Sequence, residues 1–417
     1  MEGARAAHGG APPREAPVAA RGAEAAVARL SGGRRVPELD GLRGVAILLV
    51  VVWHYFGCMV EARPGSPLAY AMTAFRMTWS GVDLFLVLSG FLIGGILLDV
   101  KESPNYFATF YTRRVYRIFP LYYLYFALFC AAYLTGAAST AGPTAELWKN
   151  PLPLWSYALF LQNFHMAAHG DTGPRAIGMT WSLAVEEQFY LVFPLLVRFL
   201  PRRAIAWTLA LVVLAAPLLR VILYYGAHLN LAPYVLMPCR ADALGLGALL
   251  AFLFRDPWFR ERLSRVSNRP LLLPGALLAV ALAFLTFKNA GAGTALAGGV
   301  GQSVLAVSYG WLLVVTLSGR AAVLERVLRG RLLQVLGRLS YGIYIYHEAV
   351  NGLCHAALGG RDTRINDAAS LALTLVAIVA TVAVAELSFR FFEAPLLRRG
   401  HAHVYGKRED RLTAAAG

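Results

Sequence analysis

Long apolar segments follow one another along most of the chain, with only short polar connections between them. A helix needs about 20 residues to cross the roughly 30 Å hydrocarbon core of a bilayer. Segments of that length predict spans at residues 41–60, 77–98, 117–138, 180–200, 204–226, 236–254, 271–287, 300–317, 336–358 and 369–392. The pattern therefore predicts an all-α, polytopic membrane helix bundle of about ten transmembrane helices.

The composition excludes an ordinary soluble protein. Hydrophobic residues make up 58% of the 417 residues and charged residues only 15%, whereas about a quarter of the residues in soluble domains are charged. Residues 1–33 are rich in Ala, Gly, Pro and Arg without an apolar run, which predicts a disordered N-terminal tail. We expect one membrane domain at residues 34–400 and a polar C-terminal tail at residues 401–417.

The Lys and Arg residues of the connections separate onto two faces of the predicted bundle. One face carries 29 of them, including those of both termini, the other carries seven, and three lie within spans. Cytoplasmic loops carry the excess of Lys and Arg, so both termini are predicted to be cytoplasmic. This distribution explains the formal net charge of +15 without a nucleic-acid partner.

Two ionisable residues share one face of the first predicted span. Arg43 and His54 are eleven residues apart, close to three helical turns, which separates them by about 16 Å along the axis. An enzyme that joins a cytoplasmic, phosphate-bearing donor to an acceptor within the bilayer needs a cation at the rim and a base deeper inside. The structural alternative is that Arg43 reaches the headgroups while His54 hydrogen-bonds a neighbouring helix.

The fourth predicted span carries two adjacent acids, Glu186 and Glu187. Adjacent helical residues point about 100° apart, so the two acids cannot play one role. Either acid could orient His54 as part of a catalytic group, and we do not separate them. The possible partners of the other acid are three basic residues: Arg220, Arg240 and His347. Two purely structural ion pairs are the alternative.

Further polar candidates lie in the apolar spans. Ser340, Tyr344 and His347 have i, i+4, i+7 spacing, which makes a polar stripe that either contributes to a site or packs helices together. Three more candidates could face a cavity: Asp83, Ser89 and Arg240. The glycine-rich patches in the second and sixth spans indicate close contact between helices. Four cysteines stand singly, without the spacing of a zinc or redox motif, and we expect no metal.

A basic cluster is predicted on the inner face. Arg114 and Arg117 are three residues apart and therefore adjacent on a helix, and residues 106–119 as a whole suit a helix lying in the cytoplasmic interface. Such a cluster suits the phosphates of a nucleotide-like donor. The alternative is ordinary positive-inside charge in contact with anionic lipid. On the outer face, the aromatic stretch 155–164 predicts a re-entrant or interfacial helix.

Several of these residues fall in motifs that resemble the acyltransferase-3 family of membrane acyltransferases. The family's first helix, with an Arg, ten residues and a His, is similar to residues 37–46, PELDGLRGVA, and the following His54. Its second-helix motif resembles residues 81–93, GVDLFLVLSGFLI, and its Arg-x-x-Arg element resembles residues 113–120, RRVYRIFP. Later family blocks are similar, in the expected order, to residues 180–190, 240–251, 340–347 and 386–395.

The resemblance implies a ten-helix bundle that takes an acyl group from acyl-CoA and delivers it to a hydroxyl, usually on a sugar. It implies that His54 is the essential base or acyl carrier, and that Arg43, Arg114 and Arg117 handle the donor on the cytoplasmic side. Some members carry an extra extracytoplasmic hydrolase-like domain, for which we expect no room here.

We therefore expect a multi-pass enzyme of the cell membrane that transfers acetyl or another short acyl group from acyl-CoA. The acceptor could be a surface glycan, a glycolipid or a macrolide-type metabolite, and the sequence carries no signal for an oligomeric state. The alternative is a multipass secondary transporter, because buried charges near the midplane also describe that class. The chain has no recognisable inverted repeat or paired broken helices to support it.

Overall fold

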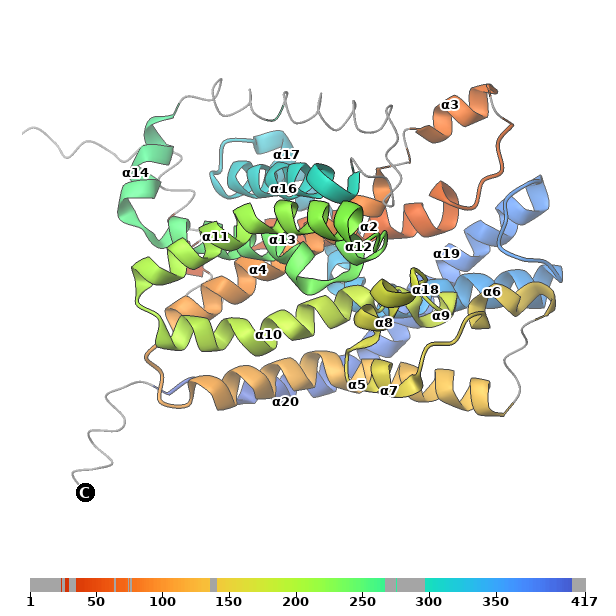
Figure 1. Cartoon of the computed structure of the whole chain (residues 1–417), viewed down its shortest axis with the longest axis horizontal. Helices are drawn as coiled ribbons and strands as arrows, with labels where there is room; N and C mark the ends of the chain where they lie inside the picture. The colour runs from red at the N-terminus through yellow and green to blue at the C-terminus, as the bar shows by residue number, and fades with distance from the viewer. Residues whose placement is uncertain are drawn as a thin grey trace, which may run out of the picture.

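The computed structural model describes residues 27–29, 35–63, 65–73, 77–135, 141–266 and 297–406, together with residues 24, 75 and 275. The predicted tail at 1–33, the predicted span at 271–287 and residues 407–417 of the C-terminal tail lie outside these residues, apart from the isolated positions named. The long helices of the described residues pack into one bundle (Figure 1), and among these residues a single bridge joins Val60 to Ile365. The all-α prediction is confirmed.

The first half of the bundle contains four long helices joined by short ones. The long helices are α2 (Pro37–Val52), α4 (Gly81–Asp99), α5 (Tyr106–Leu134) and α10 (Trp181–Phe199). The connecting elements are η1 (Trp53–Gly57), α3 (Pro67–Thr73), η2 (Thr78–Ser80), η3 (Gly142–Thr144), α6 (Ala145–Trp148), α7 (Leu154–Ala158), α8 (Gln162–His169) and α9 (Arg175–Gly178).

The second half repeats this alternation of long and short elements. The long helices are α11 (Arg202–Val221), α13 (Met237–Arg255), α16 (Gln302–Leu317), α18 (Arg331–Gly359) and α19 (Ala368–Ser388). The short elements are η4 (Ile222–Gly226), α12 (Ala232–Val235), α14 (Pro257–Arg265), η5 (Ala297–Gly301), α17 (Ala322–Leu328), η6 (Phe389–Glu393) and α20 (Ala394–Ala402).

Seven helical segments of the described residues are long and apolar enough to cross a membrane. They contain α2, α4, α5, α11, α13, α16 and α19, each at a predicted span. Two other long helices, α10 and α18, also fall at predicted spans, 180–200 and 336–358, but are less uniformly apolar. The chain is a multi-pass membrane protein, and the total of about ten crossings and the cytoplasmic location of the termini stay predictions.

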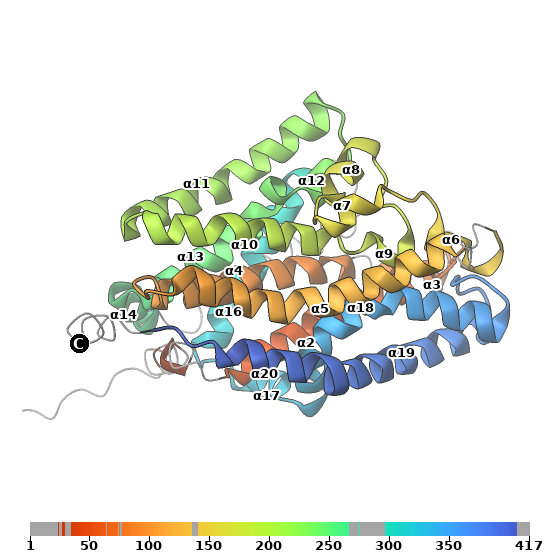
Figure 2. The same ribbon diagram turned by 90° about the horizontal axis from the view of Figure 1, so that it is seen from below.

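The centre of the bundle is formed by α4, which packs closely against α13. A Cβ at Gly90 would clash with the carbonyl oxygen of Leu244, so the two backbones approach as only a residue without a side chain allows. This confirms that the glycine-rich patches of these two spans mark close helix contact. In contrast, α11 and α19 lie at the periphery (Figure 2) and expose apolar side chains such as Leu214 and Val379, as expected of lipid-facing helices.

Two interfacial predictions need correction. Residues 106–119 do not form a separate interfacial helix, because α5 runs without interruption from Tyr106 to Leu134. The aromatic stretch 155–164 does not form one helix either, since it is divided between α7 and α8 by a break at which Phe160 has a positive φ of 55°. The short helices α6 to α9 lie at the end of the bundle opposite to α14 (Figure 2).

Candidate active site

His54 lies where α2 leaves regular helical geometry. The chain continues from α2 into the π-helical turn η1, in which His54 is the second residue, and single π turns are frequent at functional sites. Its Nδ1 atom lies 2.9 Å from the carbonyl oxygen of Val50. Because a carbonyl can only accept, Nδ1 carries a proton, and in the neutral imidazole Nε2 has a free lone pair. Nε2 is therefore the nitrogen through which His54 can act as a base.

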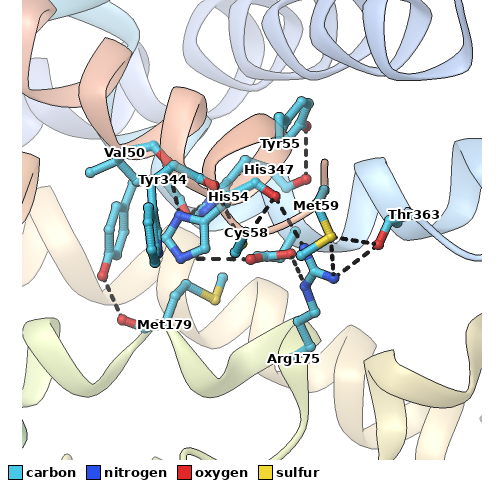
Figure 3. Close-up of polar contacts among 12 residues, drawn as sticks. Val50, His54, Tyr55, Cys58, Met59, Arg175, Met179, Tyr344, His347 and Thr363 are labelled. Atoms are coloured by element: carbon cyan, nitrogen blue, oxygen red, sulfur yellow. Dashed lines mark hydrogen bonds and ion pairs between the residues drawn. The ribbon is translucent and has the colours of Figure 1, made fainter. Parts of the chain in front are cut away.

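A carboxylate faces this lone pair. The Oε1 atom of Glu348, on α18, lies 3.7 Å from Nε2 of His54, and its side chain is only 3% exposed. The other carboxylate oxygen, Oε2, accepts a hydrogen bond of 2.7 Å from Nε of Arg175 on α9. Figure 3 shows His54 between the aromatic side chains of α18 and the Arg175 side chain. The carboxylate can stabilise the imidazolium that forms when Nε2 takes a proton.

A second histidine completes the group, which we call the outer cluster: His54, Arg175, His347 and Glu348. The rings of His54 and His347 meet edge to face at a centroid distance of 4.9 Å. His347 Nδ1 lies 2.7 Å from the carbonyl oxygen of Tyr344, and its buried Nε2 has no hydrogen-bond partner among the described residues. The Tyr55 hydroxyl donates to the carbonyl oxygen of His347 at 2.8 Å and so ties η1 to α18.

Three groups of the outer cluster could ligate a metal. The ligand atoms of His54, His347 and Glu348 lie within 4.8 Å of one another, and imidazole and carboxylate are suitable zinc ligands. The Arg175 guanidinium, however, already occupies one oxygen of Glu348 and places a positive charge beside the group. These contacts favour a proton-handling cluster over a metal centre, and the absence of a metal stays a prediction.

The predicted donor residues line a cavity of about 260 Å³, which we call the inner cavity. Its walls come from five helices: α2, α4, α5, α10 and α18. It brings together Arg43, Ser89, Arg114, Arg117, Glu186, Ser340 and Tyr344 from the sequence-based candidates. Three guanidinium groups and one carboxylate give this lining an excess of positive charge. The side of the cavity formed by α4 is apolar, with Phe85, Leu86, Leu92 and Ile93.

The polar groups of the inner cavity are linked through Tyr190. Its hydroxyl lies 2.6 Å from Oγ of Ser89 and 3.2 Å from Oε2 of Glu186, and the Arg114 guanidinium lies over its ring at 6.0 Å. The Nε atom of Arg114 is buried and has no hydrogen-bond partner among the described residues. Guanidinium groups with free donors, arranged around one cavity, are suited to phosphate oxygens.

Tyr344 connects the inner cavity to the outer cluster. Its side chain lines the cavity, and its hydroxyl is held by Oγ of Ser182 at 2.6 Å and by the carbonyl oxygen of Met179 at 2.5 Å. The Tyr344 ring lies 5.8 Å from the ring of His347, which in turn contacts His54. A continuous series of side chains therefore leads from the cationic cavity to the candidate base.

The structure corrects the partners predicted for the buried charges. Neither Glu186 nor Glu187 lies against His54: Glu186 lines the inner cavity, and Glu187 has a buried oxygen without a hydrogen-bond partner among the described residues. Arg220 and Arg240, two of the three arginines within predicted spans, pair with other carboxylates. Asp83 pairs with Arg240 at 2.5 Å and Asp242 pairs with Arg220 at 2.9 Å, in the core between α4, α11 and α13. Asp83 and Arg240 thus lie outside the inner cavity.

Sequence reasoning missed Glu348 and Arg175. A signal existed for Glu348, because it follows His347 in a predicted span, where any ionisable residue demands a partner or a function. In the sequence, Arg175 is one of the few Lys and Arg residues of the face with less positive charge. Nothing near it in the sequence indicates that its side chain points toward the bundle. Its role depends on the path of the loop between α8 and α10.

Together these features define a class: a helical membrane protein in which a cationic cavity adjoins a buried cluster of histidine, glutamate and arginine. The acyltransferase domain family matches residues 36–388, and the chain belongs to this family. The resemblance found in the sequence is thereby confirmed, and so is the acyltransferase class. The transporter alternative receives no support.

Similar curated proteins are bacterial O-acetyltransferases. The peptidoglycan O-acetyltransferase OatA of Listeria monocytogenes is 28% identical over 90% of this chain and 58% of that protein. The putative peptidoglycan O-acetyltransferase YrhL of Bacillus subtilis is 28% identical over 88% of this chain and 56% of that protein. The O-acetyltransferase OatA of Staphylococcus aureus is 23% identical over 88% of this chain and 58% of that protein. The chain thus spans little more than half the length of these relatives, and no solved structure matches it.

Proposed function

We propose that the protein is a membrane-embedded O-acyltransferase that moves a short acyl group, acetyl in the first instance, from acyl-CoA to a hydroxyl of a sugar-containing acceptor. The observation that carries the proposal is the adjacency of the cationic inner cavity to the outer cluster through Tyr344. Family membership supplies the reaction class. The three relatives are named O-acetyltransferases, which favours acetyl over longer acyl groups.

The inner cavity is the proposed donor site. Arg43, Arg114 and Arg117 would bind the phosphates of acyl-CoA on the cytoplasmic side, because guanidinium groups form charge-assisted hydrogen bonds with phosphate oxygens. The apolar side of α4 would accommodate the uncharged pantetheine arm. The thioester then lies at the Tyr344 end of the cavity, where the side chains lead toward His54.

The proposed step uses His54 as a general base. Nε2 takes the proton of the acceptor hydroxyl while the hydroxyl oxygen attacks the thioester carbonyl carbon; the C–S bond breaks, and the ester and the CoA thiolate form. The imidazolium is stabilised by the Glu348 carboxylate and returns its proton to the thiolate. In a variant of this step, Nε2 itself attacks the thioester and carries the acyl group to the acceptor.

A glycan at the outer surface is the proposed acceptor, in the cell membrane in which the protein would lie with both termini in the cytoplasm. Two of the relatives are named for peptidoglycan, so cell-wall glycan fragments are the first acceptors to test. Glycolipids and macrolide-type metabolites follow in the same panel, because the outer cluster by itself does not select among hydroxyl acceptors.

The test is acceptor-dependent thiol release from acetyl-CoA by the purified protein in detergent or nanodiscs. Wild type is compared with His54→Ala and Arg43→Ala, and with Arg361→Gln as a control, because Arg361 is an outer-surface arginine that pairs with Asp367. We expect release that depends on acceptor, disappears in His54→Ala and persists in the control. If well-folded wild-type protein neither binds nor cleaves acetyl-CoA or other short acyl-CoAs with any acceptor, the proposal fails.

The same protein distinguishes the two forms of the step. Incubation with acetyl-CoA labelled in the acetyl group, without acceptor, is expected to leave no label on the protein if His54 acts as a base. Stable label that is lost in His54→Ala and discharged by acceptor would instead identify an acyl-histidine intermediate.

A further inference from the structure

Arg175 reaches from the short helix α9 into the outer cluster and contacts three separate segments. Its Nε donates to Glu348 at 2.7 Å, one terminal nitrogen donates to the hydroxyl of Thr363 at 2.9 Å, and the other donates to the carbonyl oxygen of His54 at 3.2 Å. The side chain is 21% exposed. The Arg175 guanidinium therefore contacts the helical turn that carries His54, the carboxylate of Glu348 and the loop before α19 (Figure 3).

The π-helical turn explains why the carbonyl of His54 is available. In a regular helix, the backbone N–H of Cys58 would donate to His54, but here it donates to Trp53 at 3.1 Å. The carbonyl of His54 is thereby released from the helix, and its remaining contact within the turn is the weak thiol donor of Cys58 at 3.8 Å. The local geometry of η1 thus creates the acceptor that Arg175 uses.

The charge balance of the cluster depends on this guanidinium. Burial, the largest single influence, lowers the pKa of Arg175, but the charge and hydrogen bond of Glu348 together with Cys58 and Glu146 outweigh it, so the pKa lies above its ordinary value and the group stays charged. Within the part of the chain that the structure describes, the salt-bridge contacts of Glu348 are with His54 and Arg175, and Arg175 is its one permanently charged partner. An ionised carboxylate that is buried without a cation is costly.

We propose that Arg175 is a positioning residue for acyl transfer: it holds one oxygen of Glu348, so that the other oxygen faces Nε2 of His54. It also fixes the backbone of His54 through the released carbonyl. This inference rests on the proposed function, because it assigns Arg175 a part in the same reaction. Arg175 lies on the opposite side of the outer cluster from the inner cavity and acts only through Glu348 and His54.

The test measures kcat and the KM for acetyl-CoA in Arg175→Gln, Arg175→Lys, Glu348→Gln and the double variant Arg175→Gln/Glu348→Gln. We expect Arg175→Gln to lower kcat about 10- to 100-fold, less than the roughly 10²- to 10⁴-fold that a general base contributes, because the base itself is kept, with an unchanged KM. Arg175→Lys keeps a cation beside Glu348 and should recover most of the rate. The double variant should be at most a few-fold slower than Glu348→Gln alone, because Arg175 acts mainly through that carboxylate and keeps only its bond to the His54 carbonyl as a second route.

A matched control and a partial variant separate positioning from folding. Arg364→Gln removes an arginine next to Thr363 on the same face, where it pairs only with exposed acids, and should leave kcat unchanged. Thr363→Val removes one anchor of Arg175 without touching Glu348 and should lower kcat a few-fold. Thermal midpoints in detergent are recorded for all variants, and Arg175→Lys must unfold at the wild-type midpoint.

The outcomes distinguish the inference from the proposed function. If wild-type protein shows no acetyl transfer, the proposed function is overturned, and the role of Arg175 is overturned with it. With active wild type, the inference alone is overturned if Arg175→Gln keeps the wild-type kcat, if it raises KM in proportion to its loss of rate, or if its effect multiplies with that of Glu348→Gln. A lysine variant that folds normally but is as slow as the glutamine variant also overturns it.

Discussion

Replacing Glu348 by glutamine removes the charge that faces His54 while keeping the shape of the side chain. At the observed 3.7 Å between Oε1 and Nε2, a carboxylate and an imidazolium attract each other by about 4 kcal/mol at an effective dielectric constant of about 20. The Arg175 cation on the other oxygen cancels part of this field, which leaves about 2 to 3 kcal/mol. At about 1.4 kcal/mol for each factor of ten, Glu348→Gln should lower kcat by about 30- to 150-fold.

The assay is acceptor-dependent acetyl transfer at saturating acetyl-CoA, with the KM for acetyl-CoA as a second readout. Glu187→Gln is the informative comparison, because Glu187 has the same side chain within the same bundle but does not contact His54. We expect the KM of Glu348→Gln to equal that of wild type and Glu187→Gln to retain most of its rate. A Glu348→Gln variant within threefold of the wild-type kcat would refute the electrostatic argument, and a larger loss in Glu187→Gln would restore that acid as the orienting residue.

Four further predictions concern the cavity, the core, a helix cap and metal dependence. Arg114→Ala and Arg117→Ala should each raise the KM for acetyl-CoA about tenfold, the effect of one lost charge-assisted hydrogen bond. If the inner cavity is the donor site, isothermal titration calorimetry with CoA should rank the affinities of wild type and the two variants in the same order. Asp83→Ala leaves the buried Arg240 without its carboxylate and should destabilise the fold by about 3 to 5 kcal/mol, measured by denaturant unfolding in detergent; an unchanged stability would contradict the importance of this pair. The pKa of Asp367 is lowered by hydrogen bonds from Arg361 and Ser370. Its contribution to stability is therefore complete above the unfolded-state pKa of about 4, declines as the pH falls below that value, and is lost only as the pH falls through the lower folded-state pKa. The difference in thermal midpoint between wild type and Asp367→Ala should accordingly be larger at pH 7 than at pH 3. EDTA should leave the transfer rate unchanged, and a loss that Zn²⁺ restores would identify the outer cluster as a metal centre.

The helical architecture could be predicted because each helix that crosses a bilayer needs a long apolar segment, and such segments are visible in the sequence. About 20 consecutive apolar residues are needed for a crossing, and each candidate span of the described residues falls at a predicted position. The arginines of the inner cavity could also be singled out from the sequence. Arg43, Arg114 and Arg117 lie on helices, and the spacing of residues along a helix shows which of them share a face. What this periodicity cannot give is the partner that each face meets.

The buried carboxylates illustrate this limit. Glu186 and Glu187 attract attention because they are adjacent in an apolar span, yet the residue against His54 is Glu348, almost three hundred positions away in the chain. Helical spacing determines the direction of a side chain but not which helix lies opposite. The assignment required the packing of α18 against α2, and Arg175 additionally required the path of an irregular loop.

The packing of α18 against α2 also explains how the inner cavity and the outer cluster are held at a fixed distance from each other. Near one end of α2, Gly44 is so close to α18 that a Cβ would clash with the carbonyl oxygen of Leu333. Beyond the other end, the same two segments are joined by the contact of His54 with Glu348 and by the hydrogen bond from Tyr55 to the backbone of His347. Because both ends are fixed, α2 and α18 form one pair that places Arg43 of the inner cavity near one end and the candidate base His54 near the other. The proposed reaction, which joins substrates from opposite sides of a membrane, would need this fixed separation, and it arises from two helices rather than from any single motif.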